Sequence, residues 1–253
     1  MLAFVSTFAI SAAAGVRIAS LNLCTDETLL MLARPSEIAS LSYLSRLPSE
    51  SPLWRTARRF PANNGSLENA LGARPTVVLT MGGGGRATAM IAKRMGLKVV
   101  DLPFAATLAD LEAQWIAVAK ALGDPRRATP LLKQLQALKA TQPARLTDAA
   151  YVSGGGQSLG SGSLGTQWME LAGLRQRRLP GDRLTLELLA TAPPKLLLRS
   201  DYRLGQASHG VAWMRHPMVA RLAPRTRTTD GRAWTCAGAP MLSEVRRLRA
   251  TTK

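Results

Sequence analysis

SLENALGARPTVVL at residues 66–79 and TLELLATAPPKLLL at residues 185–198 align residue for residue, so each half of the chain contains one copy of the same unit. In each copy Ser66 or Thr185 is suited to cap a helix, and the Glu two positions later lies in the first turn, where the helix dipole favours an anion. A proline then ends the helix, and the apolar run behind it is too short for another helix. The repeat therefore predicts, in both halves, a helix that leads into a buried parallel strand.

The segments around each copy alternate between short apolar runs and helical patterns. In the first half we expect strands at 17–21, 37–41, 77–80 and 98–102 and helices at 26–32 and 87–95. In the second half we expect strands at 149–153, 195–198 and 232–236 and helices at 166–171, 212–222 and 241–249. Such alternation is typical of parallel sheets covered by helices. The predicted fold class is α/β, with two Rossmann-like lobes whose sheets are mostly parallel.

Two helical patterns lie between the halves. Residues 108–122 carry apolar side chains at helical spacing, and Gly123-Asp124-Pro125 interrupts the pattern before a second helix over 126–141. A helical connection predicts lobes that are joined by a stiff rod and not by a flexible linker. We therefore divide the chain into an N-terminal lobe at 15–122, a backbone helix at 123–146 and a C-terminal lobe at 147–253.

The composition argues against two other classes of protein. The chain has 253 residues and a formal net charge of +17, but its basic residues form no long block, whereas nucleic-acid-binding proteins more often gather cations on one stripe. The sequence also lacks a convergent set of acids, bases or nucleophiles, and its glycine-rich segments lack the form of a phosphate-binding motif. We expect neither enzyme activity nor a nucleic acid partner, and a basic nucleic-acid-binding protein and an α/β enzyme remain the alternatives.

The first residues of the chain indicate export. Residues 2–14 are apolar but shorter than the roughly 20 residues that cross a bilayer, and small residues follow at 11–14. This pattern resembles the apolar core and the small-residue end of a secretory signal, although no basic residue precedes it. We expect residues 1–14 to be a signal-peptide remnant and the protein to be exported.

The chain contains two cysteines, Cys24 and Cys236. In an exported protein they could form one long-range disulfide, and the alternative is two free thiols. Their spacing does not match a zinc site, and the two histidines, His209 and His216, are too few for a bare zinc or manganese ion held between the lobes. We therefore predict no metal site built from protein ligands.

Several segments resemble the periplasmic binding proteins of the ferric-siderophore, haem and cobalamin group. The resemblance rests on their order: the opening at 17–27, the Leu-Glu unit that leads through Pro to a strand in each half, the segment 151–156 and Leu171-Ala172-Gly173. It implies two α/β lobes joined by one long helix, and a monomer that binds a metal chelate (a ferric siderophore, cobalamin or haem) without a cofactor. It also implies a periplasmic location and delivery of the ligand to the permease of an ABC importer, through which the protein associates peripherally with the inner membrane.

In this family a surface glutamate on each lobe docks onto arginines of the permease. The residues at the matching positions are Glu68 and Glu187, one in each copy of the repeat. The alternative is that both are ordinary acids in the first turn of a helix, which would stabilise the helix by a few tenths of a kcal/mol.

Ligands of open parallel sheets bind beyond the carboxyl ends of the strands. This rule predicts a cleft formed by residues 22–25, 42–54, 81–86, 153–165 and 237–240. Large chelates are held by aromatic faces and a few cations, and our candidate ligand-binding residues are Tyr43, Trp54, Arg86 and Trp213. For each tryptophan, packing in a core or between the lobes is the alternative.

Overall fold

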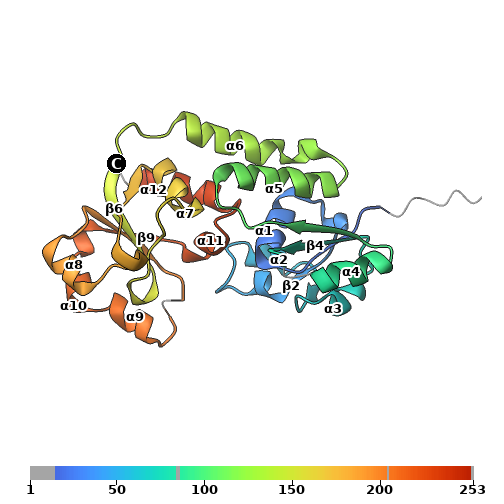
Figure 1. Cartoon of the computed structure of the whole chain (residues 1–253), viewed down its shortest axis with the longest axis horizontal. Coiled ribbons are helices and arrows are strands. Elements are labelled where there is room, and N and C mark those ends of the chain that lie inside the picture. The colour runs from blue at the N-terminus through green and yellow to red at the C-terminus, as the bar shows by residue number, and fades with distance from the viewer. Residues whose placement is uncertain (1–14, 84–85, 204, 252–253) are drawn as a thin grey trace, which may run out of the picture.

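The computed structural model describes residues 15–83, 86–203 and 205–251, so the predicted signal segment at 1–14 lies outside it. Its strands form two sheets, and all strand pairs within them are parallel. The first sheet has the order β3-β2-β1-β4-β5 and the second the order β7-β6-β8-β9. The two sheets lie in separate lobes, and helices α5 and α6 extend along one side of both lobes (Figure 1). The predicted α/β class with two parallel sheets is confirmed.

The strands are β1 (Ile18–Ser20), β2 (Ile38–Ser42), β3 (Ala62–Asn63), β4 (Val77–Met81), β5 (Lys98–Leu102), β6 (Thr147–Val152), β7 (Leu174–Gln176), β8 (Leu196–Ser200) and β9 (Thr226–Thr229). The α-helices of the first lobe and of the connection are α1 (Leu23–Leu32), α2 (Trp54–Ala57), α3 (Leu67–Leu71), α4 (Arg86–Arg94), α5 (Leu108–Ala121) and α6 (Thr129–Ala140). Those of the second lobe are α7 (Leu164–Leu171), α8 (Leu186–Thr191), α9 (His209–Met214), α10 (Pro217–Ala220), α11 (Gly231–Cys236) and α12 (Met241–Thr251).

The repeated unit forms the predicted helix and strand in both lobes. Ser66 caps α3 by accepting a hydrogen bond from the Asn69 amide, and Thr185 caps α8 in the same way from the Leu188 amide. Strand β4 follows α3 and strand β8 follows α8, and both strands are almost fully buried. Each is a central strand of its sheet, which explains its nearly continuous apolar sequence.

Helix α5 belongs to the cores of both lobes. Its last turns place Val118 against the core of the first sheet. Its first turns place Leu111 and Trp115 in a second core, which also contains α6, α7, α12 and the strands of the second sheet. A hydrogen bond from the Leu108 amide to the Gln167 side chain ties the start of α5 to α7. The two lobes are therefore connected by a packed pair of helices and not by α6 alone.

Two predicted elements are wrong. Residues 232–236 form helix α11 and not a strand, because the Asp230 side chain caps the segment by accepting from the Arg232 amide. The outer strand of the second sheet is instead the threonine-rich β9, whose β-branched residues favour an extended chain. The single helix predicted at 212–222 is divided into α9 and α10, because Pro217 has no amide hydrogen and disfavours a helical His216.

Candidate functional site

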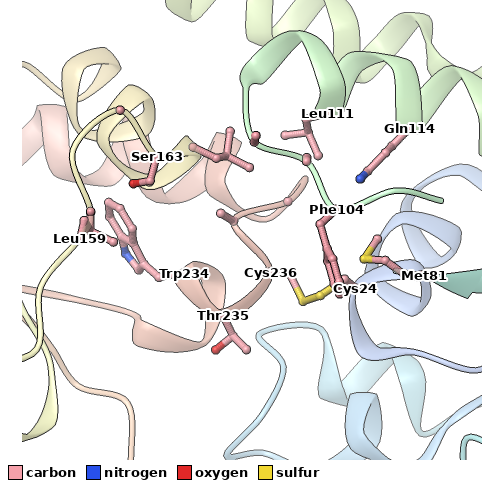
Figure 2. Close-up of a pocket in the computed structure, with 18 of the residues that line it drawn as sticks. Cys24, Met81, Phe104, Leu111, Gln114, Leu159, Ser163, Trp234, Thr235 and Cys236 are labelled. Atoms are coloured by element: carbon pink, nitrogen blue, oxygen red, sulfur yellow. A yellow bond between two sulfur atoms is a disulfide. The ribbon is translucent and has the colours of Figure 1, made fainter. Parts of the chain in front are cut away.

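A cavity of about 590 Å³ lies between the lobes, and Figure 2 shows the side chains that line it. The first lobe contributes the start of α1, the end of β4 and the segment from β5 to α5. The second lobe contributes the segment between β6 and α7 and the end of α11. In the first sheet β1 and β4 lie side by side, and their following segments diverge. The cavity thus lies beyond the carboxyl ends of the strands at a switch point of the sheet, where open α/β sheets bind ligands.

The wall from the first lobe is apolar and is dominated by Phe104, whose side chain is 71% exposed. Two contacts hold the segment that carries this ring. The buried Gln114 side chain donates to the Pro103 carbonyl at 2.6 Å, and the Phe104 ring packs on Gly82. A β-carbon on Gly82 would lie 2.4 Å from the ring, so the glycine is required for this approach. Met81 and Leu111 complete the wall (Figure 2).

The wall from the second lobe combines Trp234 of α11 with the glycine- and serine-rich segment 158–165. The Trp234 indole donates to the Thr229 hydroxyl at 2.6 Å, and its ring contacts Tyr151 with centroids 4.9 Å apart. These contacts fix the indole at the edge of the cavity. Gly165 packs against Leu159, which also lines the cavity, so the loop lies close to the start of α7.

A disulfide joins the lobes at the cavity wall. It links Cys24, at the start of α1, to Cys236, the last residue of α11, and the two Cα atoms lie 5.2 Å apart. Both cysteines line the cavity (Figure 2). The sequence did not decide between a disulfide and two free thiols, and in the structure the two cysteines form a disulfide.

None of the described lining residues is Lys, Arg, His, Asp or Glu. Two acids of α1, Asp26 and Glu27, are buried beside the lining residues Cys24 and Thr28. Burial raises the pKa of Asp26 to about 7, against the opposing effect of hydrogen bonds from Ser20 and Ser42. Burial also raises the pKa of Glu27 to about 8, although the Ser51 hydroxyl donates to it at 2.7 Å. Both carboxyl groups therefore favour the neutral form, and the described surface of the cavity is uncharged.

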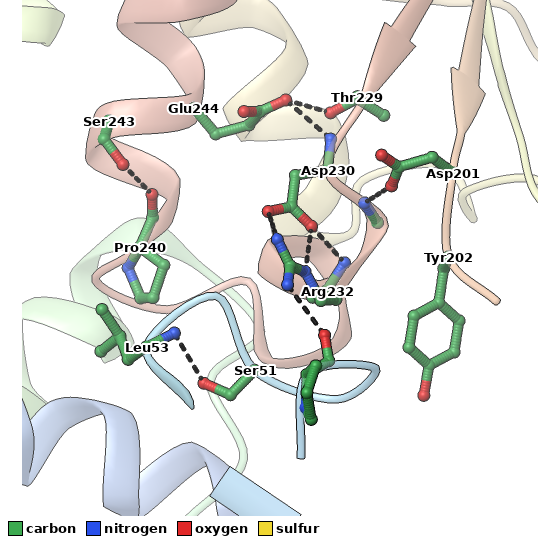
Figure 3. Close-up of polar contacts among 12 residues, drawn as sticks. Ser51, Leu53, Asp201, Tyr202, Thr229, Asp230, Arg232, Pro240, Ser243 and Glu244 are labelled. Atoms are coloured by element: carbon green, nitrogen blue, oxygen red, sulfur yellow. Dashed lines mark hydrogen bonds and ion pairs between the residues drawn. The ribbon is translucent and has the colours of Figure 1, made fainter. Parts of the chain in front are cut away.

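Polar contacts join the lobes beside the cavity, and Figure 3 shows the one that Arg232 makes. Arg232 of α11 pairs with Asp230 and donates to the Pro48 carbonyl of the first lobe at 2.8 Å. Glu50 of the first lobe accepts from the Tyr202 hydroxyl and from Arg203 of the second lobe, each at 2.7 Å. These bonds hold the segment that follows β2 against the second lobe.

The four predicted ligand-binding residues do not come together in this cavity. Tyr43 is half exposed at the end of β2, and Trp54 lies at the start of α2 with the guanidinium groups of Arg55 and Arg58 on its ring. Trp213 packs in the second lobe near Gly156. Arg86 begins α4, and its side chain lies outside the described part of the chain. Ligand binding by these residues stays a prediction.

The predicted cleft segments agree better with the cavity than the predicted residues do. Four of the five segments contribute to its lining, and the exception is 42–54, which forms the polar contacts beside it. The sequence analysis missed Phe104 and Trp234. Phe104 follows β5, so the rule that placed ligands at strand ends could have found it. Trp234 could not be found in this way, because its segment was predicted as a strand.

The two predicted docking residues, Glu68 and Glu187, are exposed and lie in the first turns of α3 and α8. These helices lie in different lobes, away from α6 (Figure 1). The Thr185 hydroxyl lowers the pKa of Glu187, so this side chain is anionic at neutral pH.

Within the described ranges, no group of three or more His, Cys, Asp or Glu side chains could hold a metal ion. Across the same residues, the structure has no helix whose length and apolar character suffice for a membrane crossing.

Solved structures of similar shape cover almost the whole chain. The periplasmic haem-binding protein HutB of Vibrio cholerae has a TM-score of 0.72 and 19% sequence identity, over 93% of this chain and 98% of that chain. The periplasmic haem-binding protein RhuT from Roseiflexus sp. RS-1 has a TM-score of 0.70 and 20% identity, over 93% and 97%. The periplasmic vitamin B12-binding protein BtuF of Vibrio cholerae has a TM-score of 0.62 and 16% identity, over 92% and 95%.

No protein-family model and no curated protein matches the sequence. The chain has the two-lobed fold of the periplasmic substrate-binding proteins of ABC importers, and the resemblance predicted from the sequence is confirmed at the level of the fold. These similar structures are of periplasmic binding proteins, in agreement with the periplasmic location that we predicted.

Proposed function

We propose that the chain is the substrate-binding component of an ABC importer, and that it captures a metal chelate in the periplasm. The proposed ligand is haem, cobalamin or a ferric siderophore, held in the cavity between the lobes. The observation that carries the proposal is this cavity of about 590 Å³ at the carboxyl ends of parallel strands. The exposed Phe104 ring on one wall suits the broad face of a tetrapyrrole or corrin, and the largely buried Trp234 indole supports the other wall.

The two lobes would contact the ligand in different ways. Phe104 is the most exposed aromatic side chain at the cavity and is free to pack on a ligand face. On the opposite wall, the hydroxyls of Ser161 and Ser163 and the glycine amides of residues 160–165 offer donors to carbonyl or carboxylate groups on the rim of a ligand. Because the described lining is uncharged, most of the affinity is expected from apolar contact and hydrogen bonds.

Delivery to the permease is the second part of the proposal. Glu68 and Glu187 are exposed, come from equivalent positions of the two lobes and lie away from α6, so one flat partner could contact both. In this arrangement the protein acts as a monomer and reaches the inner membrane only through the permease. Neither catalysis nor a cofactor enters the proposal.

Ligand titrations of Phe104→Ala test the binding site. We expect wild-type tryptophan fluorescence to be quenched by at least one of haem, cobalamin and a panel of ferric siderophores. Loss of the Phe104 ring should weaken that ligand about tenfold, which corresponds to the burial of part of one aromatic side chain. Because the ring is exposed, the variant should fold normally. Tyr43→Ala tests the residues predicted from the sequence in parallel, and Met90→Ala, which removes an exposed apolar side chain outside the cavity lining, is the control.

An unchanged affinity in Phe104→Ala together with a loss in Tyr43→Ala would show that the cavity is not the main site and would favour the residues predicted from the sequence. Binding of none of these chelates, together with tight binding of nucleic acid, would overturn the proposed function.

Docking has its own test, in which Glu68→Arg combined with Glu187→Arg should abolish transport but leave ligand affinity unchanged. Glu170→Arg, an exposed acid on α7, is the control.

A further inference from the structure

The disulfide between Cys24 and Cys236 connects parts of the molecule that would otherwise move apart. Cys24 belongs to the first lobe and Cys236 to the second, and 212 residues of chain separate them. In two-lobed binding proteins the lobes can move relative to each other about the residues that join them. Here a covalent bond joins the lobes directly in the wall of the cavity (Figure 2).

Both cysteines are held by rigid local structure. The Cys24 amide donates to the Asn22 side chain at 2.8 Å, which caps α1 and fixes its first turn on the sheet. Cys236 ends α11, and Ala237 then adopts a left-handed conformation while its carbonyl accepts from the buried Trp168 indole at 2.8 Å. Neither end can swing without breaking a helix cap or a buried hydrogen bond.

Helix α11 carries three residues that act at or beside the cavity. Arg232 donates across the interface to Pro48, Trp234 forms part of the cavity wall, and Cys236 carries the covalent link. A movement of the second lobe relative to the first at this point would therefore shift the Trp234 wall relative to the opposite one. The polar contacts of Glu50 with Tyr202 and Arg203 lie on the same side but are not covalent.

We propose that the Cys24–Cys236 disulfide sets the width of the ligand cavity and thereby selects chelates by size. With the disulfide intact, the walls at α1 and α11 keep a fixed separation, which favours a thin planar chelate. Without it, the lobes separate further, and a bulkier chelate with groups on both faces becomes easier to accommodate. This inference rests on the function proposed above, and it assigns the disulfide a role in specificity beyond stability.

The first experiment needs no ligand. Spin labels attached through unnatural amino acids at the exposed positions Lys93 and Arg221, one in each lobe, report the distance between the lobes. We expect a narrow distribution in the wild type, and a broader and longer one in the Cys24→Ser, Cys236→Ser double variant. Mild reduction and alkylation of the folded wild type should reproduce the change if the double variant does not fold. An unchanged distribution after loss of the disulfide would overturn the proposal.

The second experiment measures affinities for haem, which is thin and planar, and for cobalamin, which is bulkier on both faces. Loss of the disulfide should lower the ratio of the cobalamin Kd to the haem Kd about tenfold or more. Glu50→Gln weakens the polar contact between the lobes and keeps the disulfide, so it should leave the ratio within about twofold of the wild type.

Three other results would be decisive. If the affinities for haem and cobalamin change equally, the disulfide only stabilises the protein, and the proposed size selection is overturned. The same shift in Glu50→Gln as in the double variant would also overturn the role of the disulfide. If neither protein binds haem or cobalamin, the size selection fails, and the proposed function fails with it only when no ferric siderophore binds either.

Discussion

Glu27 shows how a single buried carboxyl group affects the stability of this protein. Its usual pKa of 4.5 is raised to about 8 by burial, and the pKa of Asp26 beside it is raised from 3.8 to about 7. At a pH between the unfolded and the folded pKa of each group, the folded protein holds a proton on that carboxyl group that the unfolded chain releases. The contribution of each group to stability is therefore full below its unfolded pKa and is lost as the pH rises to its folded pKa, at up to about 1.4 kcal/mol per pH unit.

The substitution Glu27→Gln should make the free energy of unfolding less dependent on pH between about 5 and 8. The new side-chain amide stays neutral and retains an oxygen that accepts from the Ser51 hydroxyl, as the carboxyl group of Glu27 does. Thermal melts across this range should show a variant that is close to the wild type at pH 5 and more stable at pH 8. The exposed Glu170→Gln should keep the wild-type pH profile, and a Glu27 variant that is less stable than the wild type at pH 8 would contradict this account.

A substitution at Gly82 tests whether the Phe104 ring packs directly on this residue. The residue has a φ of +83°, and a β-carbon would meet the ring at 2.4 Å. Gly96 has a similar φ of +74° but open space around it, so Gly96→Ala measures the backbone strain alone. Because the Phe104 ring is 71% exposed and can turn away from the new methyl group, we expect Gly82→Ala to be within about 1 kcal/mol of Gly96→Ala in stability. It should weaken the bound chelate, because the ring is displaced, and an affinity equal to that of Gly96→Ala would argue against the packing.

At the scale of elements, the duplicated caps offer a paired measurement. Ser66 and Thr185 accept from the amides three residues later, at 3.3 Å in each case. Alanine at either position should cost about 1 kcal/mol of stability. Because the two helices lie in different lobes, the losses should add in the double variant. Denaturant unfolding of the two single variants and the double variant checks this, and a double variant no less stable than either single one would refute the additivity.

The elements that were predicted correctly are those whose sequence pattern is local. The repeated unit contains its own cap, stop signal and apolar run, so neither lobe needed distant information. Strands β3 and β7, with two and three residues, are too short to show a period, and they form because neighbouring strands offer hydrogen bonds. Helix α11 was missed because its apolar residues resemble a strand, while Asp230, just before it, decides the conformation.

At the scale of the whole molecule, the cavity depends on contacts that no local pattern contains. Trp234 reaches it because the Thr229 hydroxyl and Tyr151 orient the ring. Phe104 reaches it because Gly82, just after the neighbouring strand β4, leaves room for the ring. The rule on strand ends could locate four of the five predicted segments at the cavity, but the identity of the exposed side chains depends on how the two lobes pack together.

Helix α5 makes the stability of the two lobes interdependent. Trp115 is fully buried in the core that α5 shares with the second lobe, and Val118, less than one turn further, is buried in the core of the first. Loss of either lobe would expose one side of this helix. With the disulfide also intact, the unfolding of one lobe removes both a packing surface and a covalent constraint from the other. We therefore expect the protein to unfold as one cooperative unit.

Calorimetry of Trp115→Ala and Leu189→Ala tests this cooperativity. The Trp115 substitution should cost about 3–5 kcal/mol and the Leu189 substitution, in the outer core of the second lobe, about 2–5 kcal/mol. For the wild type and both variants we expect one transition whose calorimetric and van't Hoff enthalpies agree. If the lobes were independent, Leu189→Ala would instead produce two resolved transitions and move only the one that belongs to the second lobe. Because Trp115 lies on the shared helix, its replacement should lower the whole transition, and a shift confined to part of it would show that α5 does not couple the lobes.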